Sequence, residues 1–87
     1  MEFEFDPAKS AANKAKHGID FVEAQALCLD GGIVDAPVIS RGEPRYLVIG
    51  RIDGKHWTAV CTLRGEAVQI ISVRRARKVE AMFYEGS

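Results

Sequence analysis

The chain has 87 residues, 47% of them hydrophobic and 28% charged, and its formal net charge is zero. This length suits a single domain, residues 1–87, with one modest core, and the composition excludes wholesale disorder. No apolar run approaches the length of a membrane span, and the acidic N-terminus is unlike a signal peptide, so we expect a cytoplasmic protein without membrane contacts. Cys28 and Cys61 have neither metal-ligand spacing nor a disulfide framework, which favours two buried core residues.

The charge is distributed unevenly along the sequence. Residues 1–40 carry a net charge of −4, whereas nine Lys or Arg against three acidic residues give residues 41–78 a net charge of +6. A positive half of this kind suits an anionic ligand, but it also suits strands and hairpins whose surface Arg and Lys keep a protein soluble. Charge alone leaves both explanations open.

The first part of the sequence predicts a short strand and two helices. Residues 2–5 alternate like a strand, and Asp6-Pro7 then supplies the N-cap and first position of a helix that stops at Gly18. A capping-box pattern, Asp20 with Glu23, opens the second helix, which runs to about residue 29.

Two stripes run along the first predicted helix. Alanines at helical spacing predict close packing against a neighbouring element, and these are Ala8, Ala11, Ala12 and Ala15. Another side carries a polar line that helical geometry alone assigns to the solvent, formed by Lys9, Asn13 and Lys16.

The second part of the sequence predicts successive antiparallel strands and a final helix. Short apolar pieces at residues 33–34 and 38–39 flank Pro37, and residues 40–44 form a loop. Three longer strands follow, joined by a hairpin turn at Asp53-Gly54 and a tight connection at residues 64–66; they cover residues 45–51, 56–63 and 67–73. A C-terminal helix is expected because Val79, Met82 and Phe83 recur at helical spacing. The predicted fold is therefore α+β, in the order β-α-α-β-β-β-β-α.

The strand over residues 67–73 is apolar on both faces, which places it inside the sheet. Simple alternation puts Val68 and Ile70 on one face and Ile71 and Val73 on the other. Ser72 and Arg74 then share a face at the strand end, with Arg75 on the opposite face. Arginine suits bidentate contact with phosphate or carboxylate, so the residues alone indicate a small α+β domain with a cationic rim.

Three motifs are spread over the chain: Asp6-Pro-x-Lys9-x-x-x-Asn13-x-x-Lys16-His17-Gly18-Ile19-x-Phe21-x-Glu23-Ala24, Arg45-x-x-x-Ile49-Gly50, and Ile71-Ser72-x-Arg74-Arg75-Ala76-x-x-x-Glu80-x-x-x-Tyr84-Glu85. In combination they resemble the BrnT family of type II toxins. The resemblance implies a RelE-like fold and a ribonuclease that arrests translation. It also implies a BrnA-like antitoxin, which neutralises the toxin and binds operator DNA through a ribbon-helix-helix domain. The chain departs from the family pattern at Val73, where Ala is usual, and at Arg77, where Thr or Ser often caps the helix.

The resemblance and the cationic rim together predict metal-independent RNA cleavage without a cofactor, in which a ribose 2′-OH attacks the adjacent phosphodiester. This step needs a base, an acid and a cation for the developing charge. The candidate catalytic residues are Arg64, Arg74 and Arg75 for charge stabilisation, and Lys16 and His17 for proton transfer. Candidates for binding RNA or the antitoxin are Lys9, Asn13, Arg45, Arg51, Arg77 and Lys78.

Two other functions remain open at this point. The same Arg-rich rim could belong to a non-catalytic module that holds RNA or an acidic protein segment. The chain could also be a toxin whose one robust property is complex formation with its antitoxin.

Overall fold

The computed structural model describes residues 2–29, 34–38 and 45–86. In these ranges the elements follow the order β1 (Glu2–Glu4), α1 (Pro7–His17), α2 (Phe21–Leu29), β2 (Val34–Val38), β3 (Arg45–Ile52), β4 (Lys55–Arg64), β5 (Ala67–Arg75) and α3 (Lys78–Gly86). The predicted α+β class and element order are confirmed. None of the described helices is both long and apolar enough to span a membrane.

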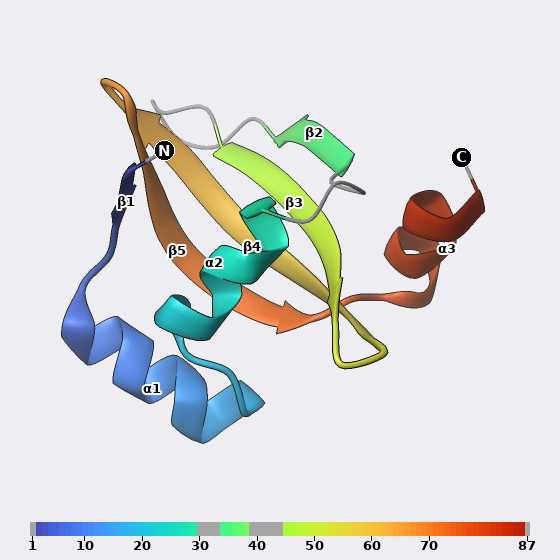
Figure 1. Ribbon diagram of the computed structural model, residues 1–87, viewed down its shortest axis with the longest axis horizontal. Coiled ribbons are helices and arrows are strands. Elements are labelled where there is room, and N and C mark those ends of the chain that lie inside the picture. Colours follow the sequence, from blue (N-terminus) through green and yellow to red (C-terminus); the bar gives the residue numbers. More distant parts are fainter. Residues whose placement is uncertain (1, 30–33, 39–44, 87) are drawn as a thin grey trace.

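The described strands form one five-stranded sheet in the order β1-β5-β4-β3-β2 (Figure 1). Neighbouring strands are antiparallel except β1, which pairs parallel with β5. The sheet is therefore mixed rather than purely antiparallel. Strands β1 and β5 are far apart in the sequence and are not joined by a hairpin, so they are free to pair in parallel.

The edge strand β2 runs through Pro37 as one continuous strand, where the sequence predicts two short pieces. An edge position tolerates proline because one side of the strand needs no hydrogen-bond donors. Residues 33, 39 and the loop expected at 40–44 lie outside the described residues.

Strand β5 lies inside the sheet, as predicted, although β4 is the middle strand. The pairing of β5 with β4 shifts register, so that Cys61 lies opposite Ile70 while Val60 lies opposite Ser72. Ile71 is thus an extra residue, a β-bulge. The predicted alternation is wrong beyond this point, because the bulge returns Val73 to the core that already contains Ile70.

Helices α1 and α2 cover one face of the sheet (Figure 1), and the core lies between them and the strands. Gly50 of β3 lies against α2, where a Cβ would approach Leu27 Cδ2 to 2.9 Å, so this glycine permits the close contact. As predicted, Cys28 and Cys61 are buried, and they form no disulfide. The core cluster comprises Ile19, Phe21, Ala24, Leu27, Cys28, Val48, Trp57, Ala59, Cys61, Ile70 and Val73.

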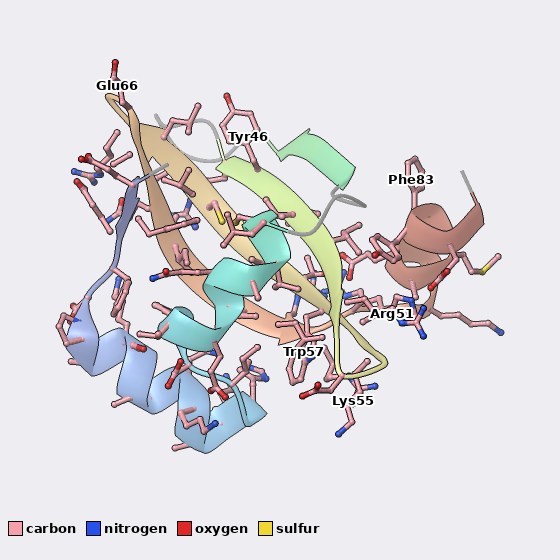
Figure 2. All side chains as sticks on the ribbon, in the orientation of Figure 1. Tyr46, Arg51, Lys55, Trp57, Glu66 and Phe83 are labelled. Carbon is pink, nitrogen blue, oxygen red and sulfur yellow. The ribbon has the colours of Figure 1, made fainter. Side chains whose placement is uncertain are left out.

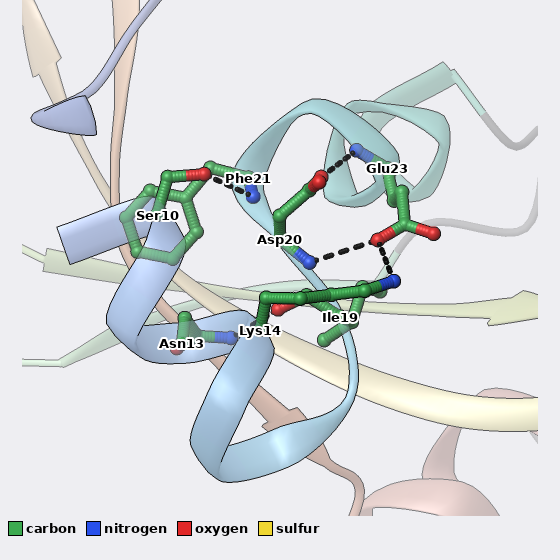
Figure 3. A network of polar contacts seen from close by, with 7 residues as sticks. All are labelled: Ser10, Asn13, Lys14, Ile19, Asp20, Phe21 and Glu23. Carbon is green, nitrogen blue, oxygen red and sulfur yellow. Dashed lines mark hydrogen bonds and ion pairs between the residues drawn. The ribbon is translucent and has the colours of Figure 1, made fainter. Parts of the chain in front are cut away.

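The predicted helix ends are confirmed. Asp6 Oδ1 accepts a 2.9 Å hydrogen bond from the Ala8 N–H, and Gly18 ends α1 in the left-handed conformation, with φ of 83°. Figure 3 shows the capping box of α2, in which Asp20 Oδ1 accepts from the Glu23 N–H at 2.7 Å and Glu23 Oε1 accepts from the Asp20 N–H at 3.0 Å.

The alanine stripe of α1 does not pack against a neighbour as expected. All four alanines are exposed, and the buried residues of α1 are Ser10 and Asn13. Ser10 Oγ accepts the Phe21 N–H at 2.9 Å (Figure 3), so the helix turns a polar side toward the protein. The physical reason is that buried backbone groups of Ile19, Phe21 and Val73 need hydrogen-bond partners, and only polar side chains of α1 can supply them.

Candidate functional site

The β3–β4 hairpin brings the first part of the site together. Asp53 and Gly54 both have positive φ, 51° and 76°, as a two-residue type I′ turn requires. This turn sets Arg51 directly opposite His56 in the ladder.

Helix α3 contacts β3 and β4 beside this hairpin. Glu85 Oε2, in its last turn, lies 2.6 Å from His56 Nε2, in a hydrogen bond where the carboxylate accepts. Arg51 Nη1 is 3.6 Å from the same oxygen, and the Tyr84 ring meets the imidazole edge-on with centroids 5.5 Å apart. The His56 side chain keeps 24% of its surface exposed, so the pair is held in place and still reaches solvent.

Arg74, at the end of β5, binds Glu80 in the first turn of α3. Its guanidinium donates two hydrogen bonds to the Glu80 carboxylate, at 2.8 and 2.9 Å. The Thr58 hydroxyl and the Arg77 N–H also donate to Glu80, at 2.9 and 2.8 Å. These donors, Arg74 above all, lower the pKa of Glu80 from its usual 4.5 to about 2 against the opposing effect of burial.

The contact to Arg77 explains how α3 starts without a Ser or Thr cap. Glu80 reaches back to the N–H of Arg77 and supplies one half of a capping box.

Arg75 lies on the opposite face of the strand end, as alternation predicts. Its guanidinium carbon is 5.4 Å from the ring centroid of Trp57, a cation–π contact that holds the side chain while the residue remains exposed.

The exposed cations of this end of the sheet form what we term the cationic corner: Arg51, Lys55, Arg75, Arg77 and Lys78. Figure 2 shows Arg51, Lys55 and Trp57 together near the β3–β4 turn.

This arrangement has the parts needed to bind and cleave an anionic ester. The cationic corner offers positive charge on rigid strand ends, and the adjacent imidazole of His56 is hydrogen-bonded to a carboxylate that orients it.

A sequence profile of one family, described as the ribonuclease toxin BrnT of a type II toxin–antitoxin system, matches residues 5–80. The chain belongs to the BrnT family. A comparison with curated proteins finds no sequence match.

Two of the arginines expected at the site of this BrnT-family chain lie elsewhere. Arg64 ends β4 opposite Ala67, at the start of β5, which places it roughly 25 Å along the strand from Arg75. There its Nε donates to Gln69 Oε1 at 2.7 Å. Arg45 begins β3 at the same far end of the sheet, and its Nε is buried without a hydrogen-bond partner among the described residues.

The polar line of α1 is divided by the fold. Lys9 and Lys16 are exposed, and His17 is half-buried at the helix end. Asn13 is buried: its amide donates to Ile19 O at 2.8 Å and to Val73 O at 2.9 Å, and its Oδ1 accepts the Val73 N–H at 3.2 Å. This geometry gives Asn13 the role of joining α1 to β5, and leaves it no free group for RNA or antitoxin.

The His56–Glu85 pair is the feature that sequence reasoning missed. The two residues are 29 positions apart, and His56 lies outside all three family motifs. Glu85 closes the third motif, but no local spacing connects it to a histidine. Lys16 and His17 lie on the α1–α2 side of the sheet, whereas His56 shares the opposite face with Thr58 and Arg74.

Proposed function

We propose that this chain is a metal-independent endoribonuclease whose cleavage of RNA arrests translation, and that a BrnA-like ribbon-helix-helix antitoxin neutralises it. The observation that carries the proposal is the hydrogen bond of the half-buried His56 to the exposed Glu85, beside the cationic corner. Membership of a ribonuclease toxin family supports it.

In the proposed reaction, phosphates of the RNA lie against the cationic corner, and a ribose 2′-OH attacks the adjacent phosphorus. His56 takes the proton of the 2′-OH, while Glu85 orients the ring and balances the charge of the imidazolium. The bond from phosphorus to the 5′ oxygen breaks, and the imidazolium returns the proton to that oxygen. The products are a 2′,3′-cyclic phosphate and a 5′-hydroxyl.

The arginines have different parts in this scheme. Arg51 lies opposite His56 on the same face of the sheet, with Nη1 3.6 Å from Glu85 Oε2, so its guanidinium is placed for the charge that develops on the phosphate. Arg75 lies on the other face, against Trp57, and belongs to the wider cationic corner. Arg74 is a positioning residue, because both of its Glu80 contacts serve to hold α3 and thereby Glu85. Arg64 is too distant to contribute to the same phosphate.

Single-turnover cleavage of RNA in the presence of EDTA tests the proposal. We expect His56→Gln to lower the rate by about 10²–10⁴-fold and Arg51→Ala by about 10²–10³-fold, whereas Arg75→Ala should have the smaller effect. His17→Gln is the matched control and should cleave near the wild-type rate. Far-UV circular dichroism and thermal unfolding check that the His56 variant keeps α3 in place.

Loss of cleavage in His17→Gln but not in His56→Gln would move the site to α1. RNA binding by the wild-type protein without any cleavage would favour the non-catalytic module that uses the same rim. In cells, expression of the chain alone should slow growth, and co-expression of the antitoxin encoded beside it should restore growth.

A further inference from the structure

Helix α3 carries an apolar side that nothing in the described part of the chain covers. Val79, Met82 and Phe83 keep 65%, 61% and 60% of their surface exposed, and with Gly86 they line a shallow hollow at positions i, i+3, i+4 and i+7. Figure 2 shows the ring of Phe83 projecting from α3 into solvent. We call these four residues the apolar stripe.

The other side of α3 is polar and faces the sheet. Glu80 binds Arg74 and Thr58, and Glu85 binds His56, so the helix is attached through charged groups. No residue of α3 is fully buried. A helix whose polar side is satisfied internally and whose apolar side is contiguous and exposed presents a surface suited to a protein partner.

The charges around the apolar stripe indicate what kind of partner fits. Arg75, Arg77 and Lys78 are exposed at the N-terminal end of α3, where the helix dipole adds further positive charge. A second copy of the chain would bring the same cations to this place. Single-stranded RNA would match the cations and could stack a base on Phe83, but flat bases with polar edges suit the aliphatic side chains of Val79 and Met82 less well. An amphipathic segment with acidic residues matches both the charge and the apolar surface.

We propose that the apolar stripe is the docking site for an acidic amphipathic helix of the antitoxin, which rests on the partner named in the proposed function. Three side chains are too few for a whole interface, since stable complexes bury roughly 800 Å² on each partner. They therefore act as the anchor of a longer contact. The stripe lies on the side of α3 away from Glu85 and His56. The antitoxin chain beyond the anchor therefore has to extend over the cationic corner to exclude RNA.

The test measures binding of the purified antitoxin, encoded beside the toxin gene, by calorimetry. We expect the double variant Met82→Glu/Phe83→Glu to weaken binding by at least about 10-fold, the effect of losing anchor residues of an interface. The matched control is Val22→Glu/Leu29→Glu on α2, where the two side chains are 61% and 70% exposed. The control should bind like the wild type. Lys78→Glu should also weaken binding and reduce its salt dependence.

Equal affinity of the wild type and the α3 variant would overturn the docking site while leaving the proposed ribonuclease intact. A wild-type dimer that the α3 variant turns into a monomer would show that a second copy occupies the stripe instead. Loss of RNA binding with unchanged antitoxin binding would assign the stripe to RNA. If the wild-type protein does not bind the antitoxin at all, the proposed partner fails together with this docking site.

Discussion

Two polar side chains join segments of the chain that are far apart in sequence. The Asn13 amide binds both backbone groups of Val73, 60 residues away, and Glu80 receives hydrogen bonds from Thr58, Arg74 and Arg77. In each case one side chain satisfies several donors or acceptors, so its loss leaves several partners unpaired. Such residues contribute to stability without belonging to the apolar core.

Replacement of Asn13 by Ala should therefore destabilise the protein. The carbonyls of Ile19 and Val73 and the N–H of Val73 would lose a buried partner, and we expect the free energy of unfolding to fall by about 2–3 kcal/mol. Urea denaturation measures the change. Lys16→Ala, an exposed position of the same helix, is the control and should stay within about 0.5 kcal/mol of the wild type. A stable Asn13→Ala variant that fails to bind RNA or antitoxin would contradict the structural role.

At the scale of elements, two of the three described helices face the sheet with polar residues. Helix α1 buries Ser10 and Asn13 and exposes its alanines, and α3 exposes Val79, Met82 and Phe83. Helix α2, by contrast, is the apolar layer, since it buries Phe21, Ala24, Leu27 and Cys28. The core therefore depends mainly on α2 and on the strand residues beneath it.

The neighbouring isoleucines of β5 differ in burial. Ile70 is 1% exposed in the core, whereas Ile71 is the extra residue of the bulge and is half-buried outside it. We expect Ile70→Ala to lower the free energy of unfolding by about 2–5 kcal/mol and Ile71→Ala by clearly less. Chemical denaturation of both variants gives the comparison. Equal losses would mean that Ile71 is buried as deeply as Ile70, contrary to the exposure seen in the structure.

At the scale of the whole molecule, the two sides of the sheet are stabilised by different physics. An apolar core holds α2 and buried hydrogen bonds of Ser10 and Asn13 hold α1, whereas ion pairs and hydrogen bonds to carboxylates hold α3. Apolar burial does not depend on pH, but a salt bridge requires an ionised carboxylate. The attachment of α3 is therefore the part of the fold that acid should weaken.

Glu80 sets the direction and range of this acid effect. Because its pKa is lowered from 4.5 to about 2, its contribution is complete above pH 4.5 and is lost as the pH falls toward and through 2. The full contribution is on the order of 3 kcal/mol. Denaturation of the wild type and Glu80→Gln over this range should show that the gap in stability closes as the pH falls. A gap that is constant with pH would mean that the ionised carboxylate does not hold α3.

Local patterns were sufficient for the fold class, the element order, both helix caps of α1, the capping box of α2 and the hairpin at Asp53-Gly54. These features depend on contacts between residues a few positions apart, which sequence spacing states directly. The position of Arg74 and Arg75 on opposite faces at the end of an internal strand was predictable for the same reason. Family membership followed from motifs spread over the chain.

Only the tertiary structure decided which side of α1 and α3 faces the sheet, where β5 bulges and which side chains meet at the cationic corner. Helical spacing predicts which residues lie on the same side of a helix. It does not predict whether another element packs on the apolar side, or whether buried backbone groups require polar side chains to face the sheet instead. The hydrogen bond of His56 to Glu85 and those of Asn13 to Val73 join residues 29 and 60 positions apart. Contacts of that range form only when the strands have paired and the helices have packed, so no local pattern in the sequence specifies them.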